Sequence, residues 1–197
     1  MPEINIATEG EVDAAFCSAI CIHCGFERTI TFPAGGKTKL DPKIPSYFRA
    51  SKFMKWLIVR DLDREYECEP LLKRALGNFS SSRDFSLRIA KQSLESWILA
   101  DVDGISAWLR VSKALISRDP DSLRYPKQYL VNLAQRSRSR NLREGLTPTT
   151  SSGATVGPEY EVELLRFAKE GWSPKRAYES GNSPSFSKCV ERLQEML

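Results

Sequence analysis

The first part of the chain alternates between short segments with strand patterning and a segment with helical spacing. Residues 3–8 alternate polar and apolar side chains and residues 26–32 do so again, so both segments predict strands. Between them, apolar side chains recur every three or four residues from Val12 to Cys24, which predicts a helix that Gly25 ends. The chain is therefore expected to begin with a strand, a helix and a second strand.

The middle of the chain continues this alternation with longer apolar runs. Residues 53–60 are almost continuously apolar, as in strands that are buried on both faces of a parallel sheet. We expect a helix over residues 69–76, a strand over 85–92 and helical structure over 94–111. Strands that alternate with helices favour an α/β fold with a mainly parallel sheet flanked by helices.

The remaining segments predict loops and a helical end. Residues 33–45 and 147–158 are rich in loop-forming residues such as Pro and Gly. Ser-Pro pairs at 173–174 and 183–184 each suit a helix cap followed by a first-turn proline, so helices are expected there. We expect three parts: an α/β core over 1–118, a basic, partly flexible connection over 119–157, and a helical part over 158–197 packed on the same domain.

The amino-acid composition limits the classes of protein to which the chain can belong. The chain has 197 residues, of which 41% are hydrophobic and 27% charged, which suits a globular protein with one well-buried core. No apolar run approaches the roughly 18 residues that span a bilayer, and no basic segment leads into an apolar one at the start. We therefore expect a cytoplasmic protein without membrane contact. The five cysteines, an odd number, favour reduced thiols over a disulfide framework.

Three of the cysteines raise the question of a cofactor. Cys17, Cys21 and Cys24 have a spacing with which radical enzymes hold an iron–sulfur cluster. On a helix, however, these three side chains share one face and pack as small apolar groups, so we expect them in the core. His23 is the single histidine of the chain, which leaves zinc sites and histidine-based catalysis with little support.

Basic residues are concentrated in one segment of a chain whose net charge is +4. Between residues 110 and 143, nine arginines and lysines face two aspartates, a balance that suits contact with a phosphate backbone. The alternative is a solvated basic surface without a ligand. The side chains expected to contact nucleic acid are Lys37, Lys39, Arg136, Arg138 and Arg140.

Acidic side chains follow three of the predicted strands. They are Glu9, Glu11, Asp13, Asp61, Asp63, Glu95 and Asp101. Because the carboxyl ends of parallel strands meet at one edge of a sheet, we expect carboxylates from different strands to gather there. Such hard oxygen ligands favour one or two Mg²⁺ or Mn²⁺ ions over zinc. Alternatively, Asp61 and Asp63 cap a helix that begins near Glu65, and Glu9 is a turn residue.

The acidic elements also carry a family resemblance. TEGEVDAAF (8–16), LIVRDLDRE (57–65) and LESWILAD (94–101) resemble, in this order, the Toprim fold, a metal-binding domain of topoisomerases, primases and OLD (overcoming lysogenization defect) nucleases. Together with residues 156–193 they resemble a small bacterial Toprim-like family of unknown function. This resemblance implies a Toprim or Rossmann-like sheet with a helical C-terminal extension.

The resemblance assigns roles to these residues. It implies that Glu9, Asp61 and Asp63 are catalytic and bind metal and that Asp13 is a further metal ligand. Glu95 and Asp101 match a later acidic element that either binds a second metal, with Glu95 as ligand and Asp101 as an accessory acid, or holds a helix. Glu11, which continues the cluster after the first strand, is a further candidate accessory acid. Asp13 is an aspartate where the small family usually has glutamate, so its side chain has a shorter reach.

The activity that the resemblance implies is hydrolysis of phosphodiester bonds. We expect an endonuclease that uses Mg²⁺ or Mn²⁺ and acts on DNA in the first place, or on RNA, as the effector of a bacterial anti-phage or DNA-maintenance system. An ABC-type ATPase is the expected protein partner, and homo-oligomerisation stays open. The alternative is a catalytically silent interaction subunit of such an ATPase complex, with Trp172 and Tyr178 either on its docking surface or in the core.

Overall fold

The structure, a computed structural model of all 197 residues, describes the chain except residues 64–68, 78, 80–81 and 150–152. The described residues form two compact units, one made of residues 1–92 and 185–197 and the other of residues 93–184. These boundaries differ from the three parts expected from the sequence, because the end of the chain belongs to the first unit. Within the described ranges, no helix combines the length and the apolar character needed to cross a membrane.

A four-stranded parallel sheet forms the centre of the first unit. Its strands are β1 (Glu3–Thr8), β2 (Arg28–Pro33), β3 (Trp56–Asp61) and β4 (Phe85–Ala90), in the order β2-β1-β3-β4. The α/β fold with a parallel sheet is therefore confirmed. β1 and β3 are neighbours, with Ala7 opposite Ile58, so their carboxyl ends lie at the same edge of the sheet.

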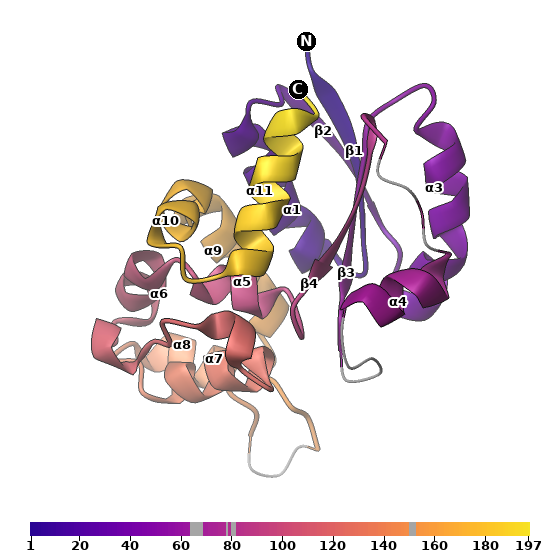
Figure 1. Cartoon of the computed structure of the whole chain (residues 1–197). Helices are drawn as coiled ribbons and strands as arrows, with labels where there is room; N and C mark the ends of the chain where they lie inside the picture. Colours follow the sequence, from indigo (N-terminus) through magenta and orange to yellow (C-terminus); the bar gives the residue numbers. More distant parts are fainter. Residues whose placement is uncertain (64–68, 78, 80–81, 150–152) are drawn as a thin grey trace. The chain divides into compact units, whose positions relative to one another are not determined.

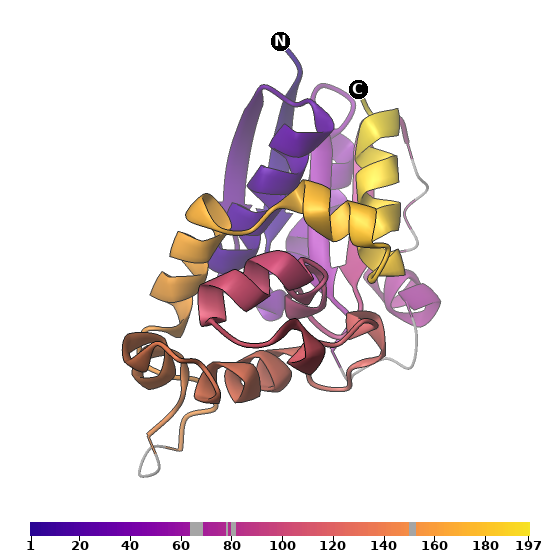
Figure 2. The same ribbon diagram turned by 90° about the vertical axis from the view of Figure 1, so that its left-hand side faces the viewer.

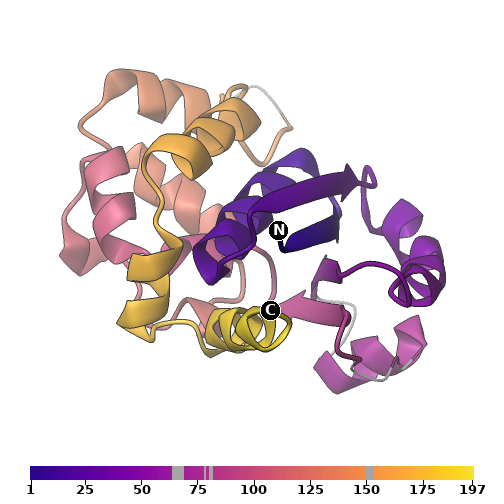
Figure 3. The ribbon, with the colours of Figure 1, turned by 90° about the horizontal axis from the view of Figure 1, so that it is seen from above.

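Helices cover both faces of this sheet (Figures 1 and 3). One face carries α1 (Glu11–Cys24) and α11 (Pro184–Glu195). The other carries α2 (Lys37–Leu40), the 3-10 helix η1 (Asp41–Lys43), α3 (Ile44–Ala50) and α4 (Glu69–Leu76).

The helical turns from Lys37 to Ala50 correct the loop that was predicted over residues 33–45. Leu40 and Ile44 are fully buried and pack with Ile58 of β3. This apolar contact with the sheet gives the segment helical structure despite its loop-like composition, since tertiary packing overrides weak local preference.

Strand alternation decides which face each β3 side chain occupies. Trp56 and Ile58 pack with the α2–α3 side, and the same alternation turns Arg60 toward that side. Leu57 and Val59 point to the opposite face, which α1 covers. A buried arginine thus follows four apolar residues of this strand.

The described cysteines are core residues, as expected. Cys17, Cys21 and Cys24 of α1 are buried beside Cys189 of α11, and all four are free thiols. Burial raises the pKa of Cys24 to about 11 and that of Cys189 to about 12. The fifth cysteine, Cys68, lies outside the described residues.

The second unit is helical throughout its regular structure (Figure 2). It contains α5 (Glu95–Leu99), α6 (Val102–Leu109), α7 (Pro126–Gln135), α8 (Arg140–Leu146), α9 (Tyr160–Glu170), α10 (Pro174–Ser180) and the 3-10 helices η2 (Lys113–Leu115) and η3 (Pro120–Ser122). The segment expected as a flexible connection therefore contributes α7 and α8. α5 is buried along its whole length and contacts α6, α7 and α10. Trp172 is buried and donates to the carbonyl of Ile98, N–O 3.2 Å, so it packs in the core.

We expect the four buried thiols to resist alkylation in the native protein. At pH 8, Cys17, Cys21, Cys24 and Cys189 should react with iodoacetamide slowly in buffer and rapidly in denaturant, because burial removes access and suppresses the thiolate. Peptide-resolved mass spectrometry measures each site separately. Rapid labelling of Cys17 or Cys21 without denaturant would contradict this assignment.

Candidate functional site

The acidic residues predicted to follow β1 and β3 lie at the carboxyl edge of the sheet, where the carboxylates of Glu9 and Asp63 both approach Arg60 Nη1. Glu9 follows β1, Asp61 is the last residue of β3, and Asp63 lies two residues further on. One carboxylate oxygen of Glu9 (Oε1) accepts a hydrogen bond from the backbone amide of Asp61, N–O 3.1 Å. We call Glu9, Asp61 and Asp63 the carboxylate rim. The parallel pairing of β1 with β3 brings these residues together although about 50 residues separate them.

Arg60 lies at the centre of the rim, with only 1% of its side chain exposed. Its Nη1 donates to Glu9 Oε1 at 3.0 Å and lies 3.4 Å from Asp63 Oδ2, while its Nε donates to Asp41 Oδ1 at 2.9 Å. The guanidinium also donates to the carbonyl oxygen of Asp61. A buried guanidinium needs such anionic partners, because the loss of its hydration costs several kcal/mol in a protein interior.

A second cation, Lys37, reaches the rim from the turn that follows β2. Its Nζ donates to Asp63 Oδ2 at 2.9 Å. The backbone amides of Gly35 and Gly36 donate to the carbonyl of Glu9 at 2.9 and 2.8 Å, which fastens this turn to the end of β1. Both glycines have positive φ, 79° and 106°, a conformation that other residues rarely adopt. The glycine pair therefore positions Lys37 beside Asp63.

Asp61 and Asp13 lie on the α1 side of the sheet. Strand alternation turns Asp61 away from the face of Arg60. Burial raises the pKa of Cys17, and after the neighbouring cysteines the charges of Asp13 and Asp61 raise it further, which places both carboxylates near this thiol. Asp13 also accepts from the amide of Gly10, N–O 2.9 Å, at the start of α1. The exposed Glu11 occupies the first position of α1.

The environment of Glu9 changes its acidity. Burial raises the pKa of Glu9 above its usual value, against the opposing effects of the Arg60 guanidinium and the Asp61 amide. The charges of Asp63 and Asp41 also raise this pKa. Glu9 therefore takes up a proton more readily than a solvated glutamate does.

The rim has the oxygen chemistry of a divalent-ion site, but its ion pairs are internal. Among the residues that the structure describes, no three His, Cys, Asp or Glu side chains are arranged to hold a metal ion. Arg60 and Lys37 supply the positive charge beside Glu9 and Asp63. Carboxylate ligands suit Mg²⁺ or Mn²⁺. A metal ion at Asp63 would share this carboxylate with Lys37 or replace Lys37.

Two predicted acids belong to the second unit and have partners there. Glu95 accepts from the hydroxyls of Ser93 and Tyr160, at 2.6 and 3.0 Å, and lies 3.5 Å from Lys127 Nζ. Asp101 accepts from the amides of Gly104 and Ser173, at 2.9 and 2.8 Å.

Asp101 also pairs with Arg176 of α10, at 2.7 and 2.8 Å. It thus caps α6 and ties α10 to that helix end. This arrangement gives Asp101 a structural role inside its own unit.

The predicted nucleic-acid contacts are divided between the units, and all but the half-buried Lys37 are exposed. Lys39 lies near Lys37 in the first unit. Arg136, Arg138 and Arg140 surround the turn between α7 and α8 in the second, where Arg140 pairs with Glu144 at 2.7 Å.

Sequence reasoning missed two residues at the rim, Arg60 as its central cation and Asp41 as a partner of that cation. Arg60 left a signal, since a charged residue inside an apolar strand requires buried partners. Asp41 left none, because nothing in the LDPK segment distinguishes it from a surface aspartate. The predicted helix near Glu65, which Asp61 and Asp63 would cap, falls outside the described residues.

Known proteins add no guide to this site. No protein-family model, no curated protein and no solved structure matches the chain. What the site does must therefore be inferred from the chemistry of the rim and of the residues around it.

We expect Arg60→Met to lower the free energy of unfolding by about 3–5 kcal/mol at neutral pH, because it leaves Glu9 and Asp41 without their buried cation. Urea denaturation measures the loss. Arg49→Met is the matched control: Arg49 is exposed and contacts only Ser46 among the described interactions, so its loss should stay within about 0.5 kcal/mol.

The destabilisation of Arg60→Met should shrink on acidification. The pKa of Glu9 is already raised in the folded protein, so ionisation of this group disfavours folding as pH rises through its pKa, and removal of Arg60 increases that cost. Protonation of Glu9 at lower pH removes the unpaired charge. A destabilisation that is unchanged between pH 7 and pH 4.5 would show that charge pairing is not its cause.

Proposed function

We propose that the protein is a divalent-metal-dependent nuclease that hydrolyses phosphodiester bonds of DNA or RNA. The observation that supports this best is the position of Glu9, Asp61 and Asp63 at one edge of the sheet, where the carboxylates of Glu9 and Asp63 lie close enough to share Arg60 Nη1. Carboxylates crowd in this way at a cost that a bound cation offsets. The resemblance of the acidic sequence elements to Toprim domains points to the same chemistry.

In this proposal the rim residues have distinct roles. Glu9, Asp61 and Asp63 would hold Mg²⁺ or Mn²⁺, with Asp13 on the α1 side as a further ligand. The bound ion would stabilise the charge that develops on the phosphodiester during hydrolysis. Glu9, whose pKa is raised, would accept or donate the proton. Lys37, once it leaves Asp63, would neutralise a phosphate oxygen.

The second candidate function is a catalytically silent subunit of an ABC-type ATPase complex. The ion pairs at the rim favour it, because Arg60 and Lys37 already balance the charges of Glu9 and Asp63 without a metal ion. The two candidates differ in one measurable property, namely whether the rim binds a divalent ion. A role in anti-phage defence or DNA maintenance follows from the family resemblance in either case.

We expect the purified protein to cleave plasmid or single-stranded nucleic acid with Mg²⁺ or Mn²⁺, with or without an added ABC-type ATPase partner. Asp61→Asn and Glu9→Gln should each lower the cleavage rate by about 100-fold or more, since each removes a charge on which the transition state depends. Glu3→Gln is the matched control, because Glu3 lies at the opposite end of β1 and pairs with the exposed Arg28. Absence of cleavage under all these conditions would refute the nuclease.

Metal binding separates the two candidate functions. Calorimetric titration with Mn²⁺ should reveal a site in the wild-type protein that is lost in Asp61→Asn and retained in Glu3→Gln. A silent interaction subunit should show no Mn²⁺ site that depends on Asp61. Circular dichroism of each variant establishes that a lost site does not reflect a lost fold.

A further inference from the structure

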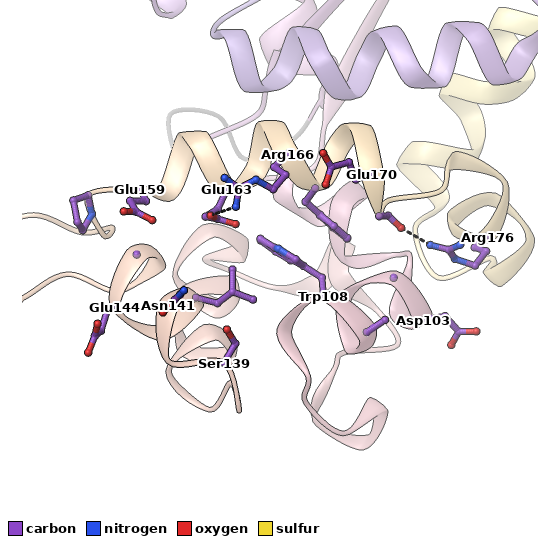
Figure 4. A pocket seen from close by; sticks show the side chains of 17 residues that line it. Asp103, Trp108, Ser139, Asn141, Glu144, Glu159, Glu163, Arg166, Glu170 and Arg176 are labelled. Carbon is purple, nitrogen blue, oxygen red and sulfur yellow. Dashed lines mark hydrogen bonds and ion pairs between the residues drawn. The ribbon is translucent and has the colours of Figure 1, made fainter.

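The second unit contains a cavity that has no part in the carboxylate rim. Its volume is about 1200 Å³, and residues of α6, α8 and α9 line most of it. Figure 4 shows the labelled side chains of α9 along one side and those of α8 facing them, with Trp108 of α6 between the two rows. The cavity lies wholly within residues 93–184.

An aromatic pair forms the apolar part of this cavity. The rings of Trp108 and Phe167 are stacked, with centroids 4.3 Å apart and planes 7° from parallel. Phe167 is buried and supports one face of the indole, whereas Trp108 is partly exposed. The indole is therefore held in a fixed orientation with surface left for a ligand. A flat, electron-rich face of this kind attracts cations.

Acidic side chains surround the aromatic pair. The lining includes five carboxylates and two guanidinium groups: Asp103, Glu144, Glu159, Glu163, Glu170, Arg166 and Arg176. Arg176 is engaged with Asp101, and Arg166 pairs with Glu163 at 2.7 Å. Asp103 pairs with Lys113 and Glu144 with Arg140, each at 2.7 Å. Within the described part of the chain, Glu159 and Glu170 form no ion pair. The cavity thus carries an excess of negative charge beside an indole face.

The carboxylates and the indole face of the cavity favour a positively charged ligand. A phosphate-bearing ligand would meet repulsion from these carboxylates, so the cavity is unsuited to the nucleic acid proposed for the rim. A guanidinium group can stack on an indole and pair with carboxylates in the same plane, which a compact ammonium ion cannot do. The volume also exceeds the roughly 300–1,000 Å³ that small-molecule sites occupy, which favours a peptide segment over a metabolite.

We propose that this cavity docks an arginine-bearing segment of a partner protein. The guanidinium of an anchoring arginine lies against Trp108, and Glu159 receives its N–H groups. A neighbouring basic residue of the segment faces Glu170. The second unit is in this way a recognition module for a basic peptide, and this holds whether or not the rim cleaves nucleic acid.

Binding of a defined probe to the full chain tests this proposal. The probe is a fluorescein-labelled nonapeptide of repeating Arg-Gly-Ser, measured by fluorescence anisotropy in 150 mM salt. Glu159→Gln should weaken binding about tenfold, and Trp108→Leu should do so by a similar factor. Glu161→Gln is the matched control, because Glu161 is an exposed carboxylate at the start of the same helix but does not line the cavity.

Each outcome decides the proposal. Equal weakening by Glu159→Gln and Glu161→Gln would reduce the effect to general charge attraction and overturn it. Loss of binding in Asp63→Asn, with Glu159→Gln unaffected, would place the peptide at the rim instead. Absence of peptide binding to the wild-type chain would also overturn the proposal. So would tighter binding of a small aromatic metabolite, for which adenosine serves as the probe, than of the peptide. Since Glu159 is at the surface end of α9, its variant remains informative if Trp108→Leu fails to fold.

Discussion

A single buried guanidinium organises the chemistry of the first unit. Arg60 stands in the central strand β3, where its neighbours are apolar, and it must find anions within reach. Glu9 directly follows β1, and Asp41 is the first residue of η1. The ion pairs of Arg60 therefore join three separate segments of the chain. Without this cation the carboxylates would repel one another in a partly buried place, and the edge of the sheet would be costly to form.

The same arrangement sets the terms for any ligand at the rim. A divalent ion, as proposed, would compete with Lys37 for Asp63 and share Glu9 with Arg60. The ion pairs with Arg60 and Lys37 keep Glu9 and Asp63 assembled without a metal ion. The cavity of the second unit is also acidic, but its carboxylates flank a stacked aromatic pair instead of a buried arginine. The two sites therefore suit different partners.

Much of the fold could be predicted because many of its elements are determined by local sequence patterns. The alternation of residues 3–8, the Gly25 end of α1 and the Ser173–Pro174 start of α10 each reflect a requirement of one segment alone. The helices within residues 37–50 and 126–146 were not predicted from the sequence. They are short and depend on contacts with residues that are distant in sequence, such as the contact of Leu40 with the sheet.

The candidate site could be predicted only in part for a related reason. Parallel strands dictate where Glu9, Asp61 and Asp63 go, so their convergence follows from the topology. In the sequence alone, Asp101 is indistinguishable from these carboxylates. In the structure it accepts hydrogen bonds from Ser173 and Arg176, which lie more than 70 residues further along the chain. Which acid serves chemistry and which serves structure is decided by those distant partners, and no local pattern reveals them.

The position of the last helix, α11, has a consequence for how the protein folds while it is being synthesised. α11 packs beside α1 and β4, with Cys24 donating to the carbonyl of Val190 and Arg192 to that of Ser82, although the whole second unit precedes it in the chain. A ribosome therefore delivers the sheet long before the helix that covers it. The helical unit is continuous in sequence and can fold before α11 is made. Until then α1 alone covers this face of the sheet, and the part that α11 covers stays exposed to other nascent chains.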